Sequence, residues 1–165
     1  MNLKKVIRLS MLISLSVVIS IIESYIPIFN NIVPGLRLGL SNIIVLFVLY
    51  KYSFKDSLYV SIVRVIIVSL IRTGFLSFFF SLSGAIFSLL SMYLVKKIKL
   101  FSVIGVSIIG SIFHSIGQII IAIILLNNSN IIYYLPYLLL FSVPTGIITG
   151  LITKKLMKID VNIID

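Results

Sequence analysis

The chain has 165 residues, of which 60% are hydrophobic and only 11% are charged, and its formal net charge is +10. A soluble domain of this length cannot bury so large an apolar fraction, so the composition excludes a soluble globular protein and indicates a lipid environment. The absence of cysteine excludes disulfides, zinc-thiolate sites and thiol nucleophiles.

The apolar stretches predict six transmembrane helices, which form an all-α bundle in one integral membrane domain covering residues 1–165. The first stretch begins like a secretory signal, but it is too long, lacks an A-x-A cleavage pattern and is interrupted by Glu23 at its far end. We therefore expect an uncleaved first helix. The expected helices cover residues 6–29, 38–50, 57–71, 74–95, 101–126 and 131–153.

Two of these helices, 38–50 and 57–71, are too short to cross a bilayer alone, because a span needs about 20 residues at 1.5 Å per residue. We expect neighbouring loop to supplement them or other helices to shelter them. Short external loops are expected at 30–37, 72–73 and 127–130.

Most basic residues gather in four clusters, and these fall at every second junction between the apolar stretches. They span residues 4–8, 51–55, 96–99 and 154–158. Lys and Arg beside helix ends resist translocation, so this alternation predicts an even number of spans with both termini in the cytoplasm. It also accounts for the net charge without a nucleic-acid partner.

Small residues form stripes at helical spacing on three of the expected helices. Because lipid tails are as apolar as leucine, such stripes pack membrane helices by close backbone approach. We expect mostly internal contacts, with the first helix as the exception that could dock another subunit. The stripes are Ser10 with Ser14, or Ser16 with Ser20, then Ser77, Ser81, Gly84, Ser88 and Ser91, and finally Ser142, Gly146, Thr149 and Thr153, with Gly146 and Gly150 forming a GxxxG motif.

Ionisable and polar residues inside the expected spans are costly in lipid and therefore mark a candidate site. Arg64 lies halfway along the third helix, on one face with Ser57 and Ser61. His114 and Gln118 share a face of the fifth helix. If these side chains converge on one interior, with Asn42 from the second helix, they form a polar binding site in an apolar cleft.

Three arginines and one glutamate are expected near the outer half of the bundle, namely Arg37, Arg64, Arg72 and Glu23. This excess of positive charge favours an anionic ligand with a carboxylate or phosphate group. An equally weighted alternative is an internal ion pair between Glu23 and Arg64, with the other two arginines reaching the interface. The substrate-binding candidates are Glu23, Arg37, Asn42, Arg64, His114 and Gln118.

The chain lacks the motifs of two enzyme classes. Its four acids, Glu23, Asp56, Asp160 and Asp165, form no cluster that could hold magnesium against a diphosphate. It also has no Walker motif, so ATP would have to be hydrolysed by another subunit. We expect no catalytic residue, no metal site and no cofactor in this chain.

The segment Pro34-Gly35-Leu36-Arg37-Leu38-Gly39-Leu40-Ser41-Asn42 resembles the signature of the Gx transporter family, also labelled heptaprenyl diphosphate synthase component I. Further similar positions follow in family order: Glu23, Pro27, Arg64-Val65, Ser81-Leu82-Ser83-Gly84, His114-Ser115-Ile116-Gly117-Gln118 and Tyr133-Tyr134-Leu135-Pro136. The chain departs from the family pattern at Ser115, where relatives often have asparagine.

Members of this family resemble the substrate-binding S components of energy-coupling factor (ECF) transporters, which have six helices and cytoplasmic termini. The resemblance implies that Ser10 and Ser14 dock a transmembrane coupling subunit that carries ATPase subunits. We therefore expect a multi-pass subunit of the bacterial cytoplasmic membrane that captures a small anionic or isoprenoid- or quinone-related nutrient. The alternatives are a noncatalytic membrane partner of heptaprenyl diphosphate synthase and a standalone secondary transporter.

Overall fold

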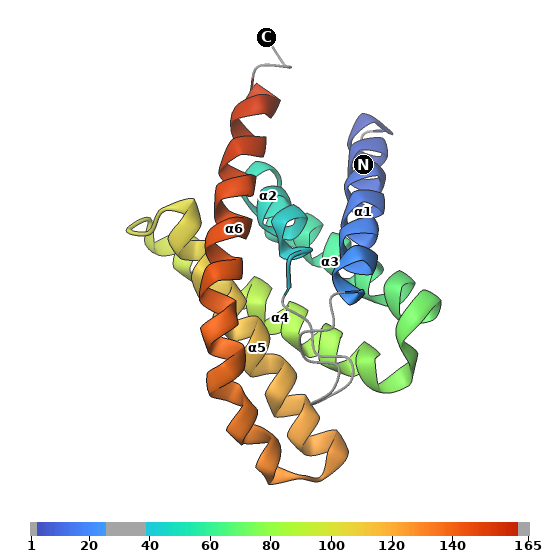
Figure 1. Cartoon of the computed structure of the whole chain (residues 1–165). Helices are drawn as coiled ribbons and strands as arrows, with labels where there is room; N and C mark the ends of the chain where they lie inside the picture. The colour runs from blue at the N-terminus through green and yellow to red at the C-terminus, as the bar shows by residue number, and fades with distance from the viewer. Residues whose placement is uncertain (1–2, 26–38, 162–165) are drawn as a thin grey trace.

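The computed structural model describes residues 3–25 and 39–161, and these residues form helices and short connections without a strand (Figure 1). The predicted all-α class is therefore confirmed for the described part of the chain. The elements in order are α1 (Leu3–Ser24), α2 (Asn42–Lys51), α3 (Phe54–Val68), the π-helical turn η1 (Ser69–Thr73), α4 (Gly74–Ile98), α5 (Val103–Leu126), the 3₁₀ segment η2 (Ser129–Tyr134) and α6 (Leu135–Val161).

Four of the helical stretches are long and apolar enough to cross a membrane, which indicates a membrane-embedded protein. They cover residues 3–24, 75–98, 103–126 and 129–159. The other two helices are shorter, with 10 residues in α2 and 15 in α3. The structure thus establishes six helices with four candidate spans, while the count of six spans stays a prediction.

Helix α2 lies inside the bundle, between α6 and α1 in the view of Figure 1. Every residue from Asn42 to Leu49 is buried. A helix that is apolar on all sides is stable when protein or lipid surrounds it, and the burial of these residues shows that protein surrounds this one. The predicted shelter for this short helix is therefore confirmed, and its length of about 15 Å does not have to match the bilayer.

The connection between α3 and α4 differs from the prediction. We expected a loop at residues 72–73, but the π-helical turn η1 carries the chain from α3 directly into α4. A single π-helical turn redirects the chain while its backbone groups remain hydrogen-bonded, as a membrane requires. The predicted loop at 30–37 lies outside the described residues.

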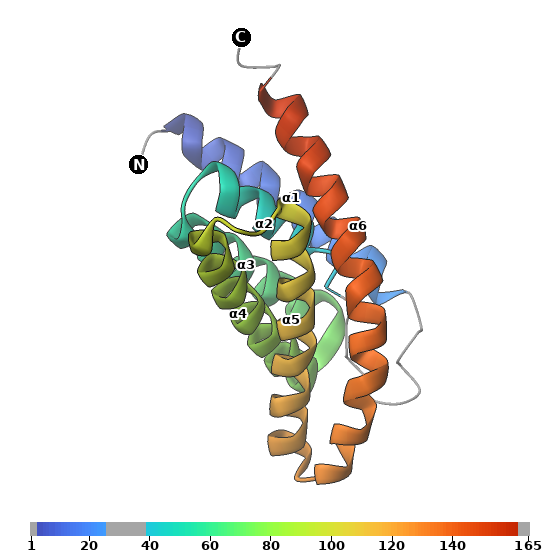
Figure 2. The ribbon, with the colours of Figure 1, turned by 90° about the vertical axis from the view of Figure 1, so that its left-hand side faces the viewer.

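The four basic clusters gather at one end of the molecule. Lys5 Nζ lies 2.8 Å from Asp56 Oδ2, which joins the start of α1 to the start of α3. Lys96 Nζ, near the end of α4, donates a hydrogen bond to the Leu49 carbonyl of α2 at 2.6 Å. Figures 1 and 2 show both chain termini at this end, opposite the turn between α5 and α6. The gathering agrees with the predicted alternation, and the cytoplasmic assignment of this end stays a prediction.

Small residues bring α4, α5 and α6 into close contact, as their spacing predicted. A Cβ atom added to Gly146 would lie 2.6 Å from Ile108 Cα, and one added to Gly150 would lie 2.7 Å from Ile104 Cα. The serine stripe of α4 is buried as well, at Ser77, Ser81, Ser88 and Ser91. These stripes therefore make internal contacts.

Candidate functional site

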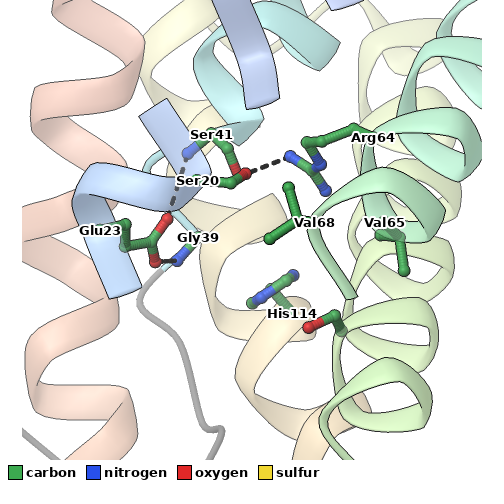
Figure 3. Close-up of a pocket in the computed structure, with 9 residues that line it drawn as sticks. Ser20, Glu23, Gly39, Ser41, Arg64, Val65, Val68 and His114 are labelled. Carbon is green, nitrogen blue, oxygen red and sulfur yellow. Dashed lines mark hydrogen bonds between the residues drawn. The ribbon is translucent and has the colours of Figure 1, made fainter. Parts of the chain in front are cut away.

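A small polar cavity lies between α1, α3, α4, α5 and the residues that precede α2 (Figure 3). Its volume is about 10 Å³, which is room for about one water molecule. Its lining is mostly polar or charged and consists of Ser20, Glu23, Gly39, Ser41, Arg64, Ser81 and His114, together with Val65 and Val68. The cavity therefore collects ionisable groups from three helices into one place within an apolar bundle.

Glu23 reaches from the last turn of α1 to the start of α2. Its carboxylate accepts hydrogen bonds from the Gly39 N–H at 2.5 Å and from the Ser41 N–H at 3.4 Å. Both N–H groups precede α2, because Ser41 is its N-cap residue and Gly39 lies two residues earlier. The N–H groups of Asn42 and Ile43, the first of the helix, donate instead to the Gly39 and Leu40 carbonyls. The carboxylate therefore ties the end of α1 to the turn that leads into α2.

Arg64 approaches the same serine from α3. Its Nη1 donates to Ser41 Oγ at 2.6 Å and lies 3.5 Å from Asn42 Oδ1. Asn42 in turn donates through Nδ2 to Ser88 Oγ of α4 at 3.2 Å. Figure 3 shows Glu23 and Arg64 reaching Ser41 from two sides. The sequence left open whether these charges pair internally or bind a ligand; in the structure both are engaged by internal hydrogen bonds that meet at Ser41.

His114 and Gln118 form a hydrogen-bonded pair on α5, beside the network of Glu23, Ser41 and Arg64. Gln118 Nε2 and His114 Nε2 lie 3.0 Å apart one turn along α5, and both residues are buried. Two glycines make room for the imidazole. A Cβ on Gly84 would lie 2.9 Å from His114 atoms, and one on Gly39, whose φ is +85°, would lie 3.2 Å from the ring. A side chain at Gly84 would therefore require His114 or Gln118 to shift.

Only part of the predicted substrate-binding set lines the cavity. Glu23, Arg64 and His114 line the cavity, whereas Asn42 and Gln118 do not line it. Asn42 lies behind Arg64 and Gln118 behind His114, each one hydrogen bond away. Arg37 lies outside the described residues. Arg72 belongs to η1 rather than to an outer loop, and its side chain is outside the described part of the structure.

Comparison with known protein families identifies the family of this chain. The family model described as heptaprenyl diphosphate synthase component I matches residues 12–156. The chain belongs to this family. No curated protein and no solved structure matches it. The predicted family resemblance is thus confirmed, and the matched range contains every residue that lines the cavity.

Six cavity residues were missing from the predicted site: Val65 and Val68, which are apolar, and four that are small or polar. Gly39 and Ser41 belong to the family signature, Ser20 was assigned only to a packing stripe, and Ser81 was assigned to a packing stripe and to the family-similar positions. For Ser20 a signal existed, because it lies one helical turn before Glu23 on α1. Ser81 Oγ is buried and has no hydrogen-bond partner among the described residues. A hydroxyl in that state can bind a water molecule or a ligand atom in the cavity.

The two serine stripes of α1 face opposite ways in this component I chain. Ser16 and Ser20 are buried, whereas Ser10 and Ser14 are exposed. The Ser14 hydroxyl donates to the Ser10 carbonyl at 3.1 Å and so stays on its own helix. The predicted docking serines are therefore on an outer face where another membrane protein can reach them.

Proposed function

We propose that this component I chain is a substrate-binding membrane subunit that captures a small molecule with a carboxylate or phosphate group. The observation that carries the proposal is Arg64, which is 3% exposed yet lines a polar cavity inside an apolar bundle. On insertion scales an arginine at the centre of a membrane helix costs about 2.5–3.5 kcal/mol. Such a cost is typical of residues on a substrate or ion pathway, and the guanidinium group is suited to carboxylate and phosphate.

The size of the cavity sets a condition on this function. A volume of about 10 Å³ admits one water molecule, whereas small-molecule sites commonly enclose about 300–1,000 Å³. Ligand entry therefore requires the elements around the cavity to move apart. The hydrogen bonds of Glu23 with Gly39 and Ser41 join α1 to the turn before α2, and that of Arg64 with Ser41 joins α3 to it; these are contacts that a ligand can exchange.

The proposed subunit works with a separate ATP-driven module of the ECF type in the bacterial cytoplasmic membrane. The support is the exposed stripe of Ser10 and Ser14 on α1, which offers small residues for close contact with a membrane helix of a coupling subunit. ATP is then hydrolysed by the ATPase subunits of that module. The ligand is a small anionic nutrient or one related to isoprenoids or quinones.

The experiment compares the small molecules that copurify with the wild-type protein and with Arg64→Ala, measured by mass spectrometry. We expect Arg64→Ala to lose the ligand by at least tenfold while retaining its helical circular dichroism. Arg64→Lys keeps the charge but loses the planar guanidinium fork, so it gives an intermediate loss. If Arg64→Ala does not fold, the ligand content of Arg64→Lys provides the test instead.

The matched control is Thr153→Val. Thr153 Oγ1 also makes a buried hydrogen bond, to the Ile43 carbonyl at 3.2 Å, but it does not line the cavity. This variant should keep the ligand. An unchanged ligand content in Arg64→Ala, or an equal loss in Thr153→Val, would remove Arg64 from the site.

A second candidate function is a noncatalytic membrane partner of the catalytic component of heptaprenyl diphosphate synthase. The family match favours it, because the name component I denotes one subunit of a synthase. The gathered basic end supplies a cationic surface that suits an acidic protein. Affinity purification from native membranes discriminates the candidates: a soluble synthase subunit supports this function, and a coupling subunit with ATPases supports the first. Recovery of neither partner supports a standalone transporter.

A further inference from the structure

The carboxylate of Glu23 occupies a position in which a ligand anion would be stabilised. Glu23 is 4% exposed and accepts hydrogen bonds from two backbone N–H groups, those of Gly39 and Ser41, at the start of α2. These N–H groups lie in the turn that leads into α2, where Gly39 has a φ of +85°. Backbone N–H groups that converge in such a turn form an anion-binding arrangement, which an internal side chain fills in this structure.

Two further features make this position more than a helix terminus. The Arg64 guanidinium lies on the other side of Ser41, with its Nη1 2.6 Å from Ser41 Oγ. Ser81, which is 6% exposed and lines the same cavity, directs a hydroxyl without a partner among the described residues into this environment. A cation, two N–H donors and a hydroxyl donor together match the needs of a carboxylate or phosphate.

The position of Glu23 within its own helix does not favour a negative charge. It lies in the last turn of α1, which ends at Ser24 and contains no basic residue in that turn. The C-terminus of a helix carries partial negative charge and disfavours a carboxylate. The hydrogen bonds from the Gly39 and Ser41 N–H groups therefore favour the carboxylate in this position, whereas the end of its own helix does not.

We propose that Glu23 is an internal competitor of the ligand: an incoming carboxylate or phosphate displaces its carboxylate from the Gly39 and Ser41 N–H groups and binds beside Arg64. This inference rests on the proposed function and specifies the ligand group and the contact that must break. The exchange replaces one anion by another, so Arg64 and the start of α2 keep a counter-charge throughout. It also explains how the site can be closed to about 10 Å³ and still be complementary to an anion.

The test measures binding of acetate and of inorganic phosphate to purified wild-type protein and to Glu23→Gln by isothermal titration calorimetry. Glutamine keeps the shape and one acceptor oxygen but removes the competing charge. We expect at least one of the two probes to bind at least tenfold more tightly to Glu23→Gln than to the wild type. The probe that gains more identifies the ligand group as a carboxylate or a phosphate.

Two controls separate this effect from a general change in charge. Asp56→Asn removes a negative charge at the basic end, away from the cavity, and should leave the affinity of either probe unchanged. Glu23→Gln combined with Arg64→Ala should lose the gain. If Glu23→Gln does not fold, Glu23→Ala leaves the same N–H groups open and gives the same test.

Weaker binding to Glu23→Gln than to the wild type would make Glu23 a direct ligand contact, and it would overturn the competitor role while leaving the proposed function intact. Absence of binding to both proteins would also overturn the inference, because the vacated N–H groups would then not accept an anion. The proposed function is judged separately, by the ligand that copurifies with the wild type and is lost in Arg64→Ala.

Discussion

The helices α4 to α6 and the helices α1 to α3 associate by different chemistry. Within the described helices, glycine occurs only in α4, α5 and α6, where it allows backbones to approach closely. The contacts among α1, α2 and α3 include charged side chains, as at Lys5 with Asp56 and at the Ser41 junction. Close backbone packing offers a ligand no donor or acceptor, whereas the hydrogen bonds at Ser41 involve groups that a ligand can also bind. The comparison therefore divides the molecule into α4 to α6, here called the fixed side because close backbone packing holds it, and α1 to α3, where charged side chains contribute to the contacts.

The largest expected effect breaks the fixed side. Gly146→Leu places a side chain whose Cβ alone would lie 2.6 Å from the Ile108 Cα atom, so the backbones of α5 and α6 must separate. We expect a loss of about 3 kcal/mol or more in the free energy of unfolding, at the upper end for overpacked sites. Unfolding in detergent with increasing sodium dodecyl sulfate, followed by circular dichroism, measures this loss.

The control for this prediction is Gly105→Ala, also on α5. The nearest atom to a Cβ at Gly105 lies 3.4 Å away, which is ordinary contact distance. This variant should be as stable as the wild type or slightly more stable, since alanine favours helix over glycine. Equal stability of Gly146→Leu and Gly105→Ala would contradict the close packing of α5 against α6.

A smaller effect is expected where the two faces of α1 are compared by the same substitution. Ser20 is 2% exposed and lines the cavity, so Ser20→Leu overfills a volume of about 10 Å³. We expect it to cost about 1–3 kcal/mol of stability and to abolish ligand binding. Copurified ligand and detergent unfolding measure the two effects.

On the other face, Ser14 is exposed and hydrogen-bonds only within α1 among the described contacts. Ser14→Leu should change stability by no more than about 0.5 kcal/mol and leave ligand binding intact. It should nevertheless weaken copurification with the coupling subunit, because a larger side chain prevents close helix contact. A stable complex between the Ser14→Leu variant and the coupling subunit would show that this face does not dock the partner.

Spacing along a helix was sufficient to predict which residues share a face. The α4 stripe, the Gly146 and Gly150 contact and the pairing of His114 with Gln118 all follow from separations of three and four residues. The short length and apolar character of α2 likewise predicted its shelter. These features could be predicted from the sequence because each depends on residues that are close along the chain.

Contacts between segments that are distant along the chain could not be predicted in the same way. Ser41 was not predicted as the meeting point of Glu23 and Arg64, because a helical pattern does not state which residue of another helix a side chain will meet. For α1, spacing offered two serine stripes without deciding which one faces inward, and only the family resemblance assigned Ser10 and Ser14 to docking. A loop was predicted at residues 72–73, between two apolar stretches, where the structure has the π-helical turn η1.

Another small effect is expected at the basic end, where an ion pair joins Lys5 of α1 to Asp56, which lies at the start of α3 outside the four candidate spans. Burial raises the pKa of Asp56, but hydrogen bonds from Lys5 and Ser53 and the Lys5 charge outweigh it, so this pKa lies below its ordinary value of 3.8. Because the folded pKa is lower than the unfolded one, the pair contributes its full stability above the unfolded pKa. That contribution is lost as the pH falls below about 3.8 and through the folded pKa.

Asp56→Asn should therefore lower stability by no more than about 1 kcal/mol at neutral pH, since Lys5 is partly exposed and water screens the pair. The difference from the wild type should shrink below the ordinary carboxyl pKa, where the wild-type pair is itself being protonated. Detergent unfolding at neutral and at acidic pH measures both values. A difference that persists unchanged at acidic pH would assign the stabilisation to the Ser53 cap of α3, which asparagine also perturbs, rather than to the charge that connects α3 to α1.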